Sequence, residues 1–205
     1  MAALSAAAAL AAPAVADAAL LGAAPQKDCY RAGEQVTLAG SGYTPNQGVA
    51  IASDGQALGS DIADAAGNFG GSLRVGVPSG EKVKTYTATD QTNPANTAAV
   101  QLRISALTVN LRPKRGKPSR RFRIGARGFT TGKTLYAHVV RKGFRRNIRI
   151  GRLKGPCHKI SARKRLFPVG IATGLYRVQF DSKRRYSKRT KVKVVRGFQV
   201  RRRIR

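Results

Sequence analysis

From residue 33 onward, short runs of alternating apolar and polar residues are separated by Gly, Pro, Asn and Asp. Alternation with a period of two predicts half-buried strands, and no stretch between residues 33 and 200 repeats with a helical period. Strands at this spacing, with turn residues between them, indicate an all-β sandwich or barrel. The predicted strands lie at 35–39, 49–53, 57–62, 68–75, 84–89 and 98–104 in the first half, and at 107–111, 121–126, 134–140, 147–153, 159–165, 175–180 and 191–195 in the second, with 198–200 as a continuation.

The two halves carry an internal echo. Gly-Tyr-Thr at 42–44 is matched by Gly-Phe-Thr at 128–130, an offset of 86 residues. The segment 86–90 is matched by 176–181, since both begin with Tyr, alternate and end in Asp. Two matches at a similar offset predict two copies of one architecture, with the boundary near 105–107.

The first half resembles a known family in its turns and core positions. The strings GEQVTLAGSGYTP (33–45), DAAGNF (64–69) and YTATD (86–90) are similar to the immunoglobulin-like repeats of secreted and cell-surface bacterial proteins. The second half resembles the family more loosely, because Gly-Pro-Cys-His at 155–158 stands in place of the DAAGNF turn. The resemblance implies two tandem immunoglobulin-like β-sandwiches, at 27–106 and 107–200, of a class that serves as spacers, adhesive modules or glycan-contacting modules and has no shared catalytic residues.

Residues 1–24 are predicted to be a signal-peptide-like segment. The apolar run 4–12 is followed by Ala14-Val15-Ala16, the small-x-small pattern that signal peptidase accepts. The alternative is an Ala-rich helix that remains part of the protein. Lys and Arg are missing ahead of the run, so the natural start is expected upstream of Met1. No later stretch has the length of a transmembrane span, and we therefore expect a secreted or envelope-associated, extracytoplasmic protein.

The two cysteines, Cys29 and Cys157, fall in different halves. Export would permit a disulfide between them, and that bond would join the halves. Two free, buried thiols are the alternative.

Charge divides the chain more sharply than any motif. The whole chain has a net charge of +30, yet residues 1–106 contain six Lys/Arg and eight Asp/Glu. Residues 107–205 contain thirty-three Lys/Arg and a single acid, Asp181. Such a field attracts polyanions, and a half-chain with one carboxylate cannot build a carboxylate pair or a carboxylate-rich metal site. The residues 201–205 are predicted to be a basic tail.

Many of these cations alternate with apolar residues and are thus built into strands. If they lie over one continuous side of the second half, they form a cationic surface that binds an anionic polymer of the cell wall or extracellular matrix. Peripheral contact with anionic lipid is a related expectation, nucleic acid is an alternative partner, and a structural spacer without a polymer ligand is another. The cations predicted to make the contact are Arg121, Arg123, Arg127, Arg145, Arg146, Arg149, Arg163, Lys164, Arg165, Arg184 and Arg185.

No catalytic constellation, metal site or cofactor site is predicted. An enzyme built from this chain would need a pocket that gathers His138, Cys157, His158 and Asp181. Cys157 and His158 are adjacent, and adjacent side chains of a strand point to opposite faces. The expectation is therefore a protein without enzymatic activity.

Overall fold

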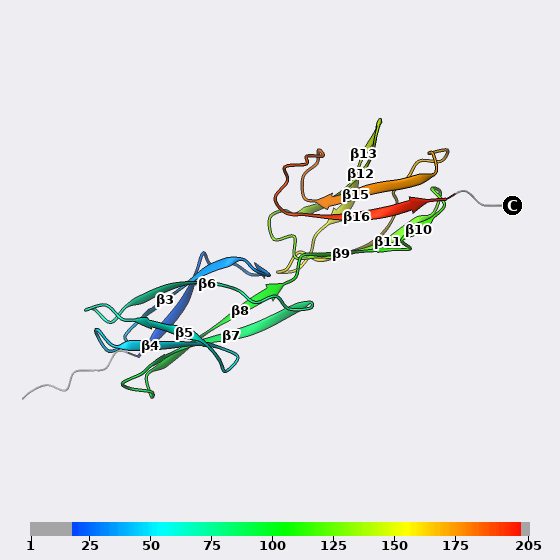
Figure 1. Cartoon of the computed structure of the whole chain (residues 1–205). Helices are drawn as coiled ribbons and strands as arrows, with labels where there is room; N and C mark the ends of the chain where they lie inside the picture. Colours follow the sequence, from blue (N-terminus) through cyan, green and yellow to red (C-terminus); the bar gives the residue numbers. More distant parts are fainter. Residues whose placement is uncertain (1–17, 202–205) are drawn as a thin grey trace, which may run out of the picture.

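The computed structural model describes residues 18–201, and every regular element in that range is a strand. The fold is all-β, as the alternating pattern predicts. Its four sheets form two β-sandwich bodies, which Figure 1 shows connected where β8 leads into β9. The described part of the chain has no helix long and apolar enough to cross a membrane. Most of the predicted signal-like segment (1–17) and of the basic tail (202–205) lies outside the described residues.

The first body has a three-stranded sheet in the order β1-β3-β6 and a five-stranded sheet in the order β2-β8-β7-β4-β5. All pairs are antiparallel except β2 with β8. The strands are β1 (Leu20–Ala24), β2 (Tyr30–Arg31), β3 (Gln35–Ser41), β4 (Gly48–Ser53), β5 (Gln56–Ile62), β6 (Phe69–Arg74), β7 (Glu81–Asp90) and β8 (Thr97–Ser105).

The second body repeats this arrangement strand for strand. Its sheets have the orders β14-β11-β9 and β10-β16-β15-β12-β13, and the pair β10–β16 is again the parallel one. The echo in the sequence thus corresponds to one topology used twice. The strands are β9 (Thr108–Arg112), β10 (Arg115–Gly116), β11 (Arg121–Arg127), β12 (Thr134–Arg141), β13 (Phe144–Arg152), β14 (Ile160–Arg165), β15 (Gly174–Asp181) and β16 (Lys193–Val200).

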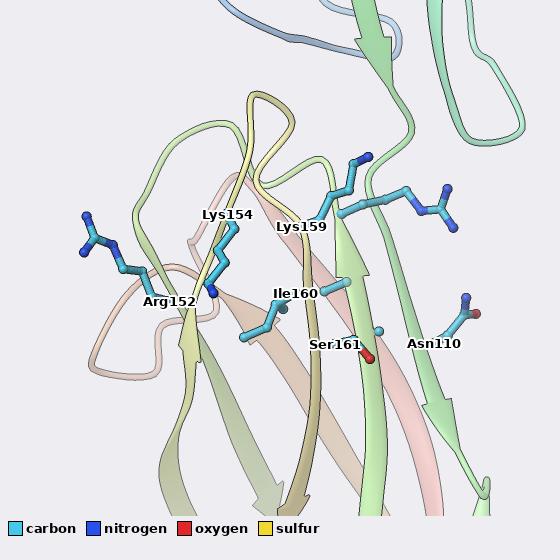
Figure 2. Close-up of a pocket in the computed structure, with 9 residues that line it drawn as sticks. Asn110, Arg152, Lys154, Lys159, Ile160 and Ser161 are labelled. Carbon is cyan, nitrogen blue, oxygen red and sulfur yellow. The ribbon is translucent and has the colours of Figure 1, made fainter.

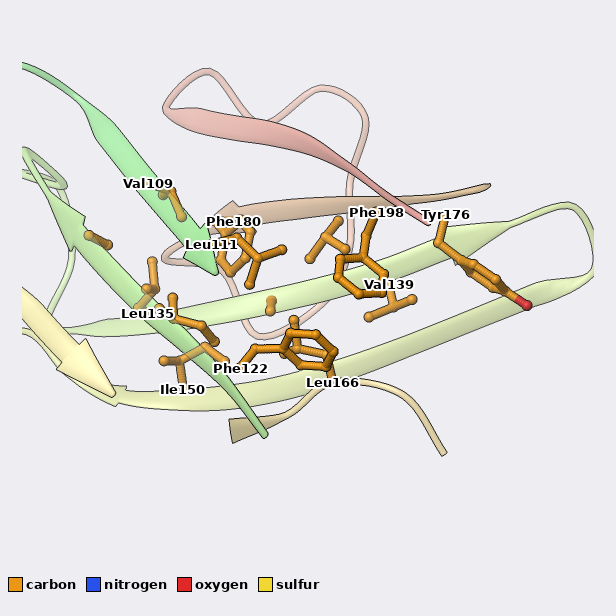
Figure 3. Packing of buried hydrophobic residues seen from close by; sticks show 14 of the residues in the cluster. Val109, Leu111, Phe122, Leu135, Val139, Ile150, Leu166, Tyr176, Phe180 and Phe198 are labelled. Carbon is orange, nitrogen blue, oxygen red and sulfur yellow. The ribbon is translucent and has the colours of Figure 1, made fainter. Parts of the chain in front are cut away.

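The core of the second body is aromatic and fills the space between its sheets (Figure 3). Phe122 of β11 meets Phe198 of β16 edge to face, with ring centroids 4.8 Å apart, and meets Phe167 at 5.8 Å. All three rings are fully buried. This packing fixes which side chains of each strand point inward, and so it also fixes which arginines point outward.

Three kinds of contact hold the junction between the bodies. Cys29 and Cys157 form a disulfide, so the bridged alternative describes this structure. Lys159 Nζ lies 2.6 Å from Glu81 Oε2 across the junction. The backbone N–H of Ala106, in the connection from β8 to β9, donates to the carbonyl of Gly80 at 2.9 Å and fixes this connection to the first body.

One boundary predicted from sequence is wrong. Residues 20–24, grouped above with the signal-like segment, form β1 and pair with β3. Leu21 and Ala23 pack on the core while the residues between them face outward, so this apolar stretch is a strand with one buried side. The two-residue strands β2 and β10 are too short to leave an alternating pattern, and the sequence did not indicate them.

Candidate anion-binding site

The outer face of the sheet β14-β11-β9 carries a ladder of arginines. Arg123 pairs directly with Arg163 on one side and with Arg112 on the other, which makes a row of three guanidinium groups across three strands. Arg121 and Arg165 form a second pair two residues further along. Phe122 and Ile124 between them are fully buried, so the arginines point away from the core. We call these five residues (Arg112, Arg121, Arg123, Arg163 and Arg165) the arginine face.

No acidic side chain in the described part of the chain relieves the electrostatic repulsion within the arginine face. Among residues 18–201, none of these five side chains forms a salt bridge. Like charges directly opposite one another on a sheet destabilise it by a few tenths of a kcal/mol or more for each pair, on the order of the measured cross-strand energies. An anion with several negative groups would remove that cost, and arginine's planar fork suits phosphate and carboxylate oxygens.

The predicted cations do not gather over one side of the second body, and that expectation is wrong. Arg145 and Arg149 pair with Val140 and Tyr136, whose positions face outward on the five-stranded sheet. They therefore lie on the opposite outer surface from the arginine face. Arg184 and Arg185 belong to the segment 182–192, here called the basic loop, which also lies on that side.

Two other predicted residues belong to neither outer face. Arg146 pairs with the buried Val139, and Lys164 pairs with the buried Phe122, so both project on the inner side of their strands. They stay exposed because β13 and β14 are edge strands. Arg127 alternates with the buried residues of β11 and therefore points to the same side as the arginine face. Its side chain, however, extends to the junction, where the guanidinium lies 3.1 Å from the position that a Cβ on Gly80 would occupy.

A hollow of about 500 Å³ adjoins the arginine face close to the junction (Figure 2). Asn110, Gly125 and Ser161 pair across the three strands and form a row of small or uncharged groups along it. The cations that line the hollow are Arg127, Arg152, Lys154 and Lys159. Lys159 also pairs with Glu81, and its hydrogen bond to that carboxyl, against the effect of burial, lowers the pKa of Glu81.

The outer side of the five-stranded sheet holds a buried polar centre beneath the basic loop. His138 Nε2 lies 3.1 Å from Asp181 Oδ1, and His138 Nδ1 lies 2.8 Å from Asn147 Oδ1. Burial disfavours the charged imidazole, but the hydrogen bonds to Asp181 and Asn147 outweigh it and raise the pKa of His138. Burial likewise acts to raise the pKa of Asp181, but hydrogen bonds from His138 and Gln179 lower it.

The polar centre anchors the basic loop to the sheet. Gln179 Nε2 donates both to Asp181 Oδ2, at 2.6 Å, and to the carbonyl of Ser187, at 2.9 Å. The ring of Tyr186 lies between His138, at 5.9 Å between centroids, and the guanidinium of Arg145, at 5.0 Å. Tyr186 is thus part of the packing that holds the loop on the sheet.

The four residues considered for catalysis have other roles. The Cys157 sulfur is bonded to Cys29, and the carbonyl of Phe129 lies 2.7 Å from His158 Nδ1. His138 and Asp181 are both fully buried and bonded to each other; the other His138 nitrogen is bonded to Asn147, and Asp181 also accepts from Gln179 and from the backbone N–H of Lys183. Within residues 18–201, no group of three His, Cys, Asp or Glu side chains is placed to hold a metal ion.

Some residues of the site were missed by sequence reasoning. Arg112 ends β9 just before Pro113, and its outward place follows from the alternation of Thr108, Asn110 and Arg112. That signal was available in the sequence. The row formed by Asn110, Gly125 and Ser161 depends on strand register, which the sequence does not reveal.

No family model matches the chain, and no curated protein matches it. Among solved structures it is similar to a Corynebacterium diphtheriae protein described as "Putative membrane anchored protein", with 13% identity and a TM-score of 0.39 over 90% of this chain and 59% of that one. It is also similar to red sea bream transglutaminase, with 14% identity and a TM-score of 0.33 over 89% of this chain and 31% of the enzyme. The chain spans about three fifths of the first protein and about a third of the second. At these scores neither similarity assigns a function.

Proposed function

We propose that this is a non-catalytic, extracytoplasmic β-sandwich protein whose basic second body binds an anionic polymer through the arginine face. The observation that carries the proposal is the row Arg112–Arg123–Arg163, in which three exposed arginines are paired directly across three adjacent strands. A row of this kind is unfavourable in the free protein and becomes favourable when a polyanion lies along it.

An extracytoplasmic location has separate support. A disulfide between Cys29 and Cys157 is typical of proteins that work in an oxidising environment. Outside the cytoplasm of a bacterium, the abundant polyanions are wall polymers, acidic glycans and lipid head groups. Contacts between Lys or Arg and an anionic surface contribute on the order of 1 kcal/mol each, so a few arginines are enough for retention.

The proposal is tested with the full chain and labelled polymers, by fluorescence anisotropy over a range of salt concentrations. Lipoteichoic acid, polygalacturonate and duplex DNA serve as polyanions, and neutral dextran is the control. The triple variant Arg112→Gln/Arg123→Gln/Arg163→Gln is compared with Arg184→Gln/Arg185→Gln/Arg189→Gln, which removes the same charge from the basic loop. We expect the first variant to lose about 100-fold in affinity, because three contacts of about 1 kcal/mol are removed, and the second to lose much less.

Each other result has a defined meaning. Equal losses in the two variants would show that net charge, and not the arginine face, governs binding. Tighter binding to DNA than to lipoteichoic acid or polygalacturonate would favour the nucleic-acid alternative. Failure to bind any polyanion at low salt would leave a structural spacer as the remaining function.

A further inference from the structure

Gly125 lies in the middle of β11, where a glycine is not expected. A glycine inside a strand costs about 0.5–1 kcal/mol relative to alanine and often marks a place where a ligand approaches the backbone closely. Gly125 is not among the glycines with positive φ, so its backbone accepts any residue. A Cβ added at this position would have the Cβ of Asn110 as its nearest neighbour, at 4.0 Å, so packing does not require a glycine either.

The missing side chain leaves open space on the outer side of the sheet. Gly125 lines the hollow of about 500 Å³, flanked by Asn110 on β9 and Ser161 on β14. Figure 2 shows the Ser161 hydroxyl and the Asn110 amide near this part of the sheet. The Asn110 amide on one side of Gly125 and the Ser161 hydroxyl on the other provide uncharged hydrogen-bond donors and acceptors.

Cations lie on both sides of this uncharged row. The row Arg112–Arg123–Arg163 lies two residues away along the strands, a step of about 7 Å. In the other direction, Arg127 lines the hollow near the junction together with Lys159, whose ammonium is paired with Glu81, and with Lys154, which forms no salt bridge among residues 18–201. The order along the strands is therefore cationic, uncharged, cationic.

We infer that the hollow over Gly125 binds a hydroxyl-bearing unit of the polymer, with the anionic groups on either side of that unit held by the two sets of cations. The ligand class is a polyhydroxylated chain that carries regularly spaced negative groups. Carboxylated polysaccharides and polyol phosphates both have this chemistry. The inference rests on the proposed function and deepens it, since the arginine face alone would accept a polyanion without hydroxyl groups.

The decisive variant is Gly125→Val, which puts a branched side chain into the hollow beside Asn110 and Ser161 and leaves every cation in place. Valine is favoured in strands, so the thermal midpoint is expected to stay equal or to rise. The matched control is Gly70→Val, because Gly70 lies exposed in β6 of the equivalent sheet in the first body and a Cβ there meets nothing within 4 Å. The variants Asn110→Ala and Ser161→Ala remove the two hydrogen-bonding groups one at a time.

The full-length proteins are titrated with two hydroxyl-bearing polymers, polygalacturonate and lipoteichoic acid, and with two polyanions that lack hydroxyl groups, polyacrylate and polyphosphate. The wild type is expected to prefer the hydroxyl-bearing pair. Gly125→Val is expected to lose about tenfold toward that pair, the effect of about two hydrogen bonds, and less than about twofold toward the other pair. Gly70→Val is expected to bind as the wild type does.

A loss confined to polygalacturonate identifies a carboxylated sugar as the ligand, and a loss confined to lipoteichoic acid identifies a polyol phosphate. The inference is overturned if Gly125→Val binds all four polymers as the wild type does, or if the wild type binds them equally. In either case polyanion binding by the arginine face would still stand. Absence of binding to all four would instead refute the proposed function itself.

Discussion

The carboxylate of Asp181 lies 3.1 Å from Nε2 of His138, and both side chains are completely buried under the basic loop. Asp181 is the single acid among the ninety-nine residues from 107 to 205. It is used to hold a histidine and a loop, and not to neutralise the arginine face. The other ring nitrogen of His138 lies against the side-chain oxygen Oδ1 of Asn147. Both nitrogens of His138 therefore face hydrogen-bond acceptors, which favours the doubly protonated imidazole.

Replacing His138 with alanine is expected to destabilise the second body. Asp181 would lose its charged partner while staying buried, which costs on the order of 3 kcal/mol. Asn147→Ala removes a single neutral partner and is expected to cost about 1 kcal/mol. Guanidinium unfolding followed by tyrosine fluorescence measures both. Equal costs for the two variants would show that the ion pair with Asp181 is not the important contact.

The same pair predicts a pH dependence. Since the pKa of His138 is raised in the folded protein, its contribution to stability is complete below the unfolded-state pKa of about 6.5 and is lost as the pH rises through the folded value. The difference in unfolding free energy between wild type and His138→Ala should therefore be larger at pH 5.5 than at pH 9. A difference that grows toward pH 9 would contradict this assignment.

Asp90 in the first body predicts the opposite pH dependence. Hydrogen bonds from Thr44, acting against burial and together with those from Thr92, hold the pKa of Asp90 far below its usual range. The contribution of the Asp90 carboxylate to the free energy of unfolding is complete above the unfolded-state pKa of about 3.9 and is lost as the pH falls through the folded-state pKa. Asp90→Asn should cost on the order of 2 kcal/mol at pH 7. In acid titrations the difference in unfolding free energy between the wild type and the variant should shrink steadily as the pH falls below about 4.

Gly128 is expected to tolerate no side chain. It has a φ of 78°, and a Cβ there would lie 2.6 Å from the carbonyl oxygen of Ala106 and 2.9 Å from Cα of Leu107. Gly128→Ala should cost about 3 kcal/mol or more, because backbone must move at the junction. Gly143→Ala is the matched control, with a φ of 72° and nothing within 4 Å, and should cost about 1 kcal/mol. Thermal midpoints of the two variants test the difference.

The disulfide predicts a redox-dependent stability. Cys29 and Cys157 are separated by 128 residues, and removing a crosslink that closes so long a loop costs about 5 kcal/mol in the chain-entropy account. The double variant Cys29→Ser/Cys157→Ser should unfold at lower guanidinium concentration than the oxidised wild type. Wild type under reducing conditions should match the variant. Coincident curves for the variant and the oxidised protein would show that the bond contributes nothing to the stability of the joined bodies.

The sequence predicted the strands well because one side of nearly every long strand is buried. In β11, Phe122, Ile124 and Ala126 are buried, and Arg121 and Arg123 are exposed, as the alternation indicates. It failed at β1, because an Ala-rich half-buried strand has nearly the composition of a signal peptide. It left the disulfide open, since two cysteines at any separation allow both a bridge and free thiols.

The comparison of Asp90 with Asp181 shows where sequence similarity misleads. Tyr86 and Tyr176 occupy the same buried place in the two bodies, and each strand ends in an aspartate. Asp90 comes four residues after Tyr86, an even number, and therefore lies on the same inner side of its strand as the tyrosine. Asp181 comes five residues after Tyr176 and therefore lies on the outer side. One additional residue in a strand moves a side chain to the other face. The first aspartate therefore caps a turn, and the second anchors the basic loop.

By itself, the sequence determined that this protein is all-β, that two similar halves follow one another, and that the second half is strongly cationic, because alternation, turn residues and charge are properties of neighbours along the chain. Only the tertiary structure decided that Arg112, Arg123 and Arg163 form a single row, that Gly125 opens a hollow beside it, and that Arg145 and Arg149 lie on the opposite side. Those relationships depend on strand register and on which sheet each strand joins. Both are fixed by the packing of residues distant in sequence, such as Phe122 on Phe198.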